Sequence, residues 1–216
     1  MRVAPAIFLG ALLCPVPAAA QTAADSAAVG RNPDAFACGV WAAGSPGASG
    51  GWPHFATTEG RRFGALGVRA SFTFARSDGV ALRYNADAIP LAVVSGSPRE
   101  LTGSRPGTAQ GSRSVEVAPA YGFGFSPVGL EVELFRQWPV RPTLGASAGV
   151  LWFGKPVPEP ESRSFNFAAE FTGGVEVSTA VGVLAVGARL HHFSNAGTAD
   201  LNPGQDTRLL YVGLRR

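Results

Sequence analysis

Cysteine is scarce in this 216-residue sequence, which contains only Cys14 and Cys38. Cys14 lies in an N-terminal segment that we expect to be removed on export, so one thiol would remain. A single thiol excludes an internal disulfide, and the exported chain must therefore be stabilised by other means.

Lysine is scarcer still, because Lys155 is the only one and arginine supplies the remaining positive charge. The formal net charge is +3, and the basic residues are scattered along the chain. This pattern lacks the clustered basic stripe of a nucleic-acid-binding protein, so no nucleic-acid partner is expected. The sequence also lacks a phosphate-binding loop, a zinc-type Cys/His spacing and a dinucleotide fingerprint, and we expect neither a cofactor nor a metal.

Long apolar runs are absent beyond the N-terminus, so no transmembrane helix of about 20 residues is expected. The N-terminus itself has a basic residue, an apolar run over 3–14 and small residues at 18–20. This is the pattern of a secretory signal. The predicted organisation is a signal peptide at 1–20, a flexible lead at 21–35 and one β-domain at 36–216 that carries a catalytic motif near its C-terminal end.

The most frequent pattern in the chain is the alternation of apolar residues with polar or small residues, with a period of two. Phe165, Phe167 and Phe171 alternate with polar or small residues such as Asn166 and Glu170. A strand with an apolar face and a sparse polar face is typical of an outer-membrane barrel, whereas the polar face of a soluble sandwich, the alternative, is usually richer in charge. We predict an all-β, eight-stranded antiparallel transmembrane barrel. The expected strands are 36–45, 62–76, 80–94, 120–136, 141–154, 163–177, 181–194 and 207–215.

The expected turns alternate in length. Residues 77–79, 137–140 and 178–180 form short turns, whereas 46–61, 95–119, 155–162 and 195–206 form longer loops, unless 115–117 extend a strand. Outer-membrane barrels place short turns in the periplasm and long loops outside the cell. The 195–206 loop is therefore expected at the outer rim.

The seventh predicted strand ends in a possible catalytic group. Its apolar residues place His192 and Ser194 on the lipid-facing side and Arg189 in the lumen. Polar residues that face lipid are costly unless they have a function. An imidazole beside a serine can activate the hydroxyl as a nucleophile, provided that a carboxylate orients the imidazole. Asp206 is the nearest candidate for that carboxylate, and Asp200 is its competitor.

An oxyanion would need hydrogen-bond donors in the same loop. The candidates are Asn195, Asn202 and the backbone amides of Gly197 and Gly204. The plain alternative is that this segment is only a polar turn. Elsewhere, the acidic residues of the strands are expected to pair inside the lumen with Arg69, Arg83 or Arg189, and His191 is expected to be luminal and structural.

Several segments carry a resemblance to one family. The sequence HFSNAG at 192–197, followed by NPG at 202–204 and an acidic residue, is similar to the lipid A 3-O-deacylases, the PagL-like acyloxyacyl hydrolases. The segments at 82–95 and 149–167 and the short final strand extend the resemblance over most of the chain after the signal.

The resemblance implies an outer-membrane barrel that removes the ester-linked acyl chain at position 3 of lipid A, its partner in the outer leaflet. By position, Ser194 resembles the nucleophile, His192 the base and Asp206 the acid, with Asn202 and Asn195 as oxyanion donors. The chain departs from the family pattern by having Asp where Glu is usual, and it lacks a C-terminal aromatic residue. The rival interpretations are a non-catalytic barrel in adhesion or envelope integrity, and a phospholipase or acyltransferase with the same triad.

Overall fold

The computed structural model describes residues 36–49, 56, 58–97, 118–160 and 162–216. The chain divides into two units, Met1–Asn32 and Pro33–Arg216. The predicted signal peptide, the predicted lead and residues 115–117 lie outside the described residues. In the described part, no helix is long and apolar enough to cross a membrane.

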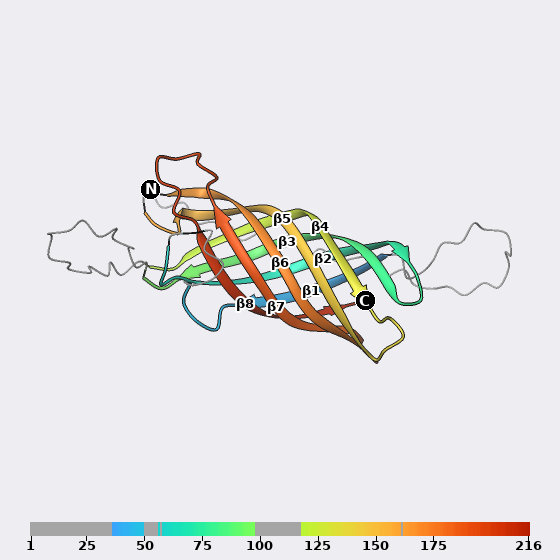
Figure 1. The fold of residues 1–216 in the computed structure, drawn as a ribbon. Helices are drawn as coiled ribbons and strands as arrows, with labels where there is room; N and C mark the ends of the chain where they lie inside the picture. The colour runs from blue at the N-terminus through green and yellow to red at the C-terminus, as the bar shows by residue number, and fades with distance from the viewer. Residues whose placement is uncertain (1–35, 50–55, 57, 98–117, 161) are drawn as a thin grey trace, which may run out of the picture. The chain divides into compact units, whose positions relative to one another are not determined.

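Eight antiparallel strands form one closed barrel, in which each strand pairs with its sequence neighbours and β1 also pairs with β8 (Figure 1). The predicted fold class is therefore confirmed. The strands are β1 (Phe36–Gly44), β2 (Arg62–Arg76), β3 (Val80–Ser95), β4 (Ala120–Leu134), β5 (Val140–Val157), β6 (Arg163–Thr179), β7 (Gly182–Ser194) and β8 (Gln205–Arg215).

Two predicted strand limits next to the longer loops were wrong, and one of them affects the site. β5 continues to Val157 through a register shift after Trp152, so it takes residues that alternation alone assigned to a loop. β8 begins at Gln205, and this places Asp206 in a strand and not in the preceding loop. A residue in a strand is held by the ladder of backbone hydrogen bonds, so Asp206 has a fixed position opposite β7.

The two faces of each strand differ as the alternation predicts. On β6, Phe165, Phe167 and Phe171 are exposed on the outer surface, whereas Asn166 and Glu170 are buried in the lumen. Large exposed apolar side chains also cover the outside of the other strands. Such a surface is costly in water and suits a barrel that is surrounded by lipid.

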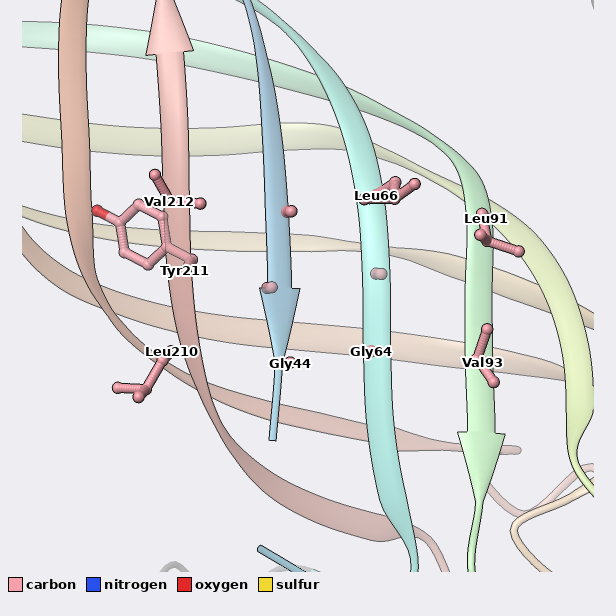
Figure 2. Close-up of a pocket in the computed structure, with 11 residues that line it drawn as sticks. Gly44, Gly64, Leu66, Leu91, Val93, Leu210, Tyr211 and Val212 are labelled. Atoms are coloured by element: carbon pink, nitrogen blue, oxygen red, sulfur yellow. The ribbon is translucent and has the colours of Figure 1, made fainter. Parts of the chain in front are cut away.

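The outer surface contains a shallow apolar depression of about 410 Å³ between β8, β1, β2 and β3. It is lined by small residues such as Gly44 and Gly64 and by larger apolar ones such as Leu66 and Val212 (Figure 2). Apart from Tyr211, the residues that line this hollow are apolar or small, so a hydrocarbon chain would fill it better than water.

The lumen is filled by ion pairs, as expected for buried charges. Arg83, which is 1% exposed, contacts Glu133 at 2.7 Å, Glu176 at 2.9 Å and Glu131 at 3.3 Å. The three luminal arginines that were predicted to pair with carboxylates all do so, since Arg69 contacts Glu131 and Asp87, and Arg189 contacts Glu170.

Aromatic rings complete this packing nearer the middle of the barrel. The guanidinium of Arg189 lies 4.0 Å from the ring centre of Trp41 and 4.8 Å from that of Tyr211. Trp41 in turn donates from Nε1 to Asp87 at 3.1 Å. The ring of Trp41 occupies the space beside Gly67, where an added Cβ would collide with it. The strands are therefore braced from inside by contacts between distant parts of the chain.

We expect Arg83→Met to lower the free energy of unfolding by about 3 kcal/mol, because the buried carboxylates around it lose a shared partner. Urea titration of barrels refolded into vesicles, followed by tryptophan fluorescence, measures the change. Arg62→Met is the control, since Arg62 is exposed at the start of β2. Equal effects of the two substitutions would contradict a stabilising role for the luminal network.

Candidate active site

The end of β7 presents different residues to its two sides. His192 and Ser194 lie on the outward side and are partly exposed, whereas Arg189, His191 and Phe193 point into the lumen and are buried. The side chain of His192 is 27% exposed, and that of His191 is 1% exposed. The adjacent histidines therefore occupy opposite environments, as strand geometry requires.

Asp206 lies directly across from His192 in the β7–β8 pair. Its Oδ1 is 2.7 Å from Nδ1 of His192, and its side chain is only 8% exposed. The other carboxylate oxygen, Oδ2, accepts the backbone N–H of Ala56 at 2.9 Å. Both oxygens are thus engaged, which fixes the carboxylate and, through it, the imidazole.

The structure thereby brings Asp206 to His192, although its side chain is one methylene shorter than the family's glutamate. The contact forms because the position opposite His192 in the ladder puts the two side chains within reach. Asp200, the competing carboxylate, is exposed in the loop between β7 and β8.

Ser194 is two residues beyond His192 on the same outward side. Side chains with this spacing lie about 7 Å apart at Cβ, which lets an imidazole approach a serine hydroxyl. Nδ1 of His192 is directed at Asp206, so Nε2 is the ring nitrogen on the other side of the imidazole. Across β6, Ser194 pairs with Phe167, an outward side chain that is 44% exposed. The hydroxyl therefore adjoins an apolar surface.

The loop from Asn195 to Gly204 is held by the side chain of Asn195, which is 2% exposed. Its Nδ2 donates to the carbonyl of Leu201 at 2.7 Å, and its Oδ1 accepts the N–H of Gly197 at 3.0 Å. The backbone N–H of Asn195 donates to Oδ1 of Asn202 at 3.0 Å. Asn195 and Gly197 thus brace the loop, whereas Asn202 is exposed and directs only its oxygen into this network.

Gly204 closes the loop beside the histidine. It has a φ of 61°, and a Cβ built on it would lie 3.2 Å from Cε1 of His192 and 3.3 Å from the Cβ of Ala56. A left-handed backbone with this little space favours glycine. Gly204 therefore lets the chain pass close to the imidazole on the way into β8.

The luminal side behind the site is rigidly packed. Nδ1 of His191 is 2.8 Å from Oε1 of Glu170, whose Oε2 accepts from Arg189 at 3.0 Å. The ring of His191 also stacks on Phe63 with the ring centres 4.3 Å apart. These contacts tie β7 to β6 and β2 directly beneath His192 and Ser194.

One member of this site could not be predicted from the sequence. The N–H of Ala56 holds Asp206 from the loop between β1 and β2, and Thr58 forms a parallel bridge with Gln205 in the same region. A backbone donor leaves no mark on residue type, since any residue except proline supplies it. Pairing between residues 150 positions apart can be seen only in the fold.

A closed barrel that carries a serine and a hydrogen-bonded His–Asp pair on its outward face, beside apolar side chains, defines a class of protein: a candidate ester hydrolase that works at a lipid surface. The comparison with protein families specifies the class further. The family model described as lipid A 3-O-deacylase (PagL) matches residues 94–215, more than half of the chain. The chain belongs to this family.

A solved structure shows the same fold. The crystal structure of the outer membrane enzyme PagL matches with a TM-score of 0.51 and 20% identity, over 82% of this chain and 98% of that chain. Neisserial surface protein A matches with a TM-score of 0.45 and 16% identity, over 84% of this chain and 96% of that chain. No curated protein sequence matched the chain.

We expect Asp206→Asn to lower the rate of ester hydrolysis by about 10³- to 10⁴-fold, because an amide neither stabilises an imidazolium nor favours the same tautomer. It would also lose one of the two accepting oxygens that now bind His192 and Ala56. Asp206→Glu should keep substantial activity, since glutamate is the usual residue of the family.

The measurement is release of fatty acid at equal amounts of folded barrel. If Asp206 only ended a turn, the ranking would be the opposite, because Asn serves turns as well as Asp does. An Asn variant as active as the parent would remove Asp206 from the triad.

Proposed function

We propose that this chain is an outer-membrane serine esterase that removes the 3-O-linked acyl chain of lipid A. The observation that carries the proposal is the 2.7 Å contact between His192 and Asp206 on the outward side of β7, two residues from Ser194. Membership of the lipid A 3-O-deacylase family supports the reaction and the substrate.

The proposed chemistry begins with proton transfer from Ser194 to Nε2 of His192 as Oγ attacks the acyl carbonyl. Asp206 accepts a hydrogen bond from Nδ1 and stabilises the imidazolium. The tetrahedral intermediate collapses to an acyl-serine, and His192 returns the proton to the 3-hydroxyl of the departing sugar. Water then attacks the acyl-serine with His192 as the base, which releases the 3-hydroxy fatty acid and restores Ser194.

The oxyanion of the intermediate requires donors close to Ser194. Nδ2 of Asn202 and the N–H of Gly204 are the proposed donors, because Oδ1 of Asn202 alone is engaged by the loop. Asn195 and Gly197 support the loop, and through it the position of Asn202.

The location of the group agrees with the substrate. An acyl ester of lipid A lies where the sugar meets the hydrocarbon of the outer leaflet, and the family's barrels carry their long loops on that side. Ser194 lies at the long-loop end of β7, beside Phe167, and thus at the border between polar loop and apolar wall. No metal or organic cofactor is needed for this reaction.

Mass spectrometry of lipid A and phospholipids from cells with and without the protein tests the proposal. We expect loss of one 3-hydroxyacyl chain from lipid A, with phospholipids unchanged. Phospholipid hydrolysis, or acyl transfer to another lipid, would instead assign the triad to a phospholipase or acyltransferase. Unchanged lipids in the presence of folded barrel would leave a non-catalytic envelope protein.

A further inference from the structure

The short turns of the barrel surround a polar cavity of about 380 Å³ at the end opposite to the candidate active site. All eight strands contribute residues to it or to its rim. Five of these residues are arginines, which we call the arginine mouth: Arg76, Arg136, Arg141, Arg215 and Arg216. Among the described residues that line the cavity, Glu133 is the only acidic one.

The carboxylates near the mouth are shared among several cations. Oε1 of Glu133 lies 2.8 Å from Nε of Arg141 and 3.7 Å from Nε of Arg136, while its Oε2 binds Arg83. Glu176, one layer deeper, is shared by Arg215 and Arg83. Positive charge therefore exceeds negative charge at this opening.

A donor remains available at the mouth. The Nε atom of Arg215 is buried and has no hydrogen-bond partner among the described residues. The Nε atoms of Arg141 and Arg136 are buried too, and both have to share Oε1 of Glu133, at 2.8 Å and 3.7 Å. A buried donor without an acceptor is rare in folded proteins and indicates a bound water or ion. Here the arginines line a cavity with excess positive charge, which indicates an anion.

We infer that the arginine mouth binds a phosphate group. A guanidinium offers paired N–H donors that match phosphate oxygens, and several guanidiniums around one cavity would satisfy the charge and the donors together. The cavity volume accommodates a phosphate together with a short polar substituent, as in the headgroup of an anionic phospholipid.

The surroundings favour a lipid as the source of the phosphate. Phe135 and Trp138 flank Arg136 in the turn between β4 and β5, are stacked with ring centres 4.6 Å apart, and are 44% and 52% exposed. Tryptophan is enriched at the membrane–water interfaces of membrane proteins, at the level of the headgroups. In the proposed orientation the short turns meet the inner, phospholipid leaflet, so the mouth would lie beside phosphodiester headgroups. Only this choice of source rests on the proposed function.

Native mass spectrometry of the full barrel in neutral detergent tests the inference. The probes are phosphatidylglycerol, phosphatidylcholine and inorganic phosphate. We expect phosphatidylglycerol to bind about tenfold more tightly than phosphatidylcholine, as an added charge-assisted contact would produce. The double variant Arg136→Gln/Arg141→Gln should lose this preference. The control Arg62→Gln/Arg163→Gln removes the same charge from exposed positions at the other end and should keep it.

The outcomes separate the sources. Phosphatidylglycerol binding that inorganic phosphate does not displace identifies the lipid headgroup, whereas displacement by millimolar phosphate identifies a site for the free ion. If Arg136→Gln/Arg141→Gln fails to fold, Arg76→Gln/Arg216→Gln tests the same cavity with two exposed arginines.

If the variants of the arginine mouth and the control variant prefer phosphatidylglycerol over phosphatidylcholine to the same extent, the inference is overturned. The readout is binding and not deacylation. An inactive enzyme that still prefers phosphatidylglycerol would therefore contradict the proposed function and leave the phosphate site intact.

Discussion

A Ser194→Ala barrel is expected to fold and to release no detectable 3-hydroxy fatty acid from lipid A. Removal of the nucleophile of a serine hydrolase lowers the rate by about 10⁶-fold, because base and acid cannot act without the atom that attacks. The substitution removes one hydroxyl from a partly exposed position at the end of β7, so the barrel should be as stable as the parent. Lipid A from cells that produce the variant, analysed by mass spectrometry, gives the answer.

Ser164→Ala provides the matched control. Ser164 lies at the same end of the barrel on β6, next to Phe165, whose side chain faces outward, so Ser164 is on the luminal side. The same chemical change there should leave the rate within about twofold of the parent, since Ser164 lies on the face opposite to the candidate site and substitutions away from special features have small effects. Fatty acid release by Ser194→Ala at the parental rate would exclude Ser194 from the mechanism.

The fold could be predicted because barrel strands have a strict period. One face of each strand contacts lipid and the other contacts the packed polar lumen, so successive residues must alternate between apolar and polar or small. The sequence of β6 shows this alternation. The pairing of luminal charges followed from the same reasoning, since Arg83 and Arg189 need carboxylates when they are buried in a packed lumen. The alternation does not show where the regular pairing of strands ends. For this reason the predicted end of β5 and the predicted start of β8 were wrong.

The candidate site was predictable to a smaller extent. His192 and Ser194 are two residues apart on one strand, so their side chains must lie on the same face. This prediction requires no knowledge of the other strands. The contact with Asp206 depends on the register between β7 and β8, and register is set by the whole barrel. The hydrogen bond from the backbone N–H of Ala56 to Asp206 comes from a loop that is distant in sequence, and it involves no side chain of that loop.

The site and the lumen are two sides of one strand. His192 and Ser194 face outward, whereas Arg189 and His191 before them and Phe193 between them are buried in the luminal packing. Besides Asp206 and Gly204, the proposed catalytic pair depends for its position on the strand that carries it. The stack of His191 on Phe63 and its bond to Glu170 supply that support.

This arrangement makes the two adjacent histidines a test of the facing of β7. We expect His192→Gln to lower the rate of deacylation by about 10⁴-fold or more, because glutamine cannot take a proton from Ser194. His191→Gln should retain most of the rate, since an amide can still bind Glu170 in place of Nδ1. It should mainly lower the stability of the barrel, as the stack on Phe63 is lost.

Both variants would be refolded, separated from unfolded protein by their heat-modifiable mobility on gels, and assayed for fatty acid release from lipid A at equal folded concentration. The parent and Ser194→Ala give the upper and lower limits of the assay. If the catalytic residues lie on the outward side of β7, the His192 variant should lose more of the rate of fatty acid release than the His191 variant. A larger loss at His191 would mean that the reactive side is the luminal one, since a shift of one residue along a strand exchanges its two faces. In that case the contact between His192 and Asp206 would serve only to join β7 to β8.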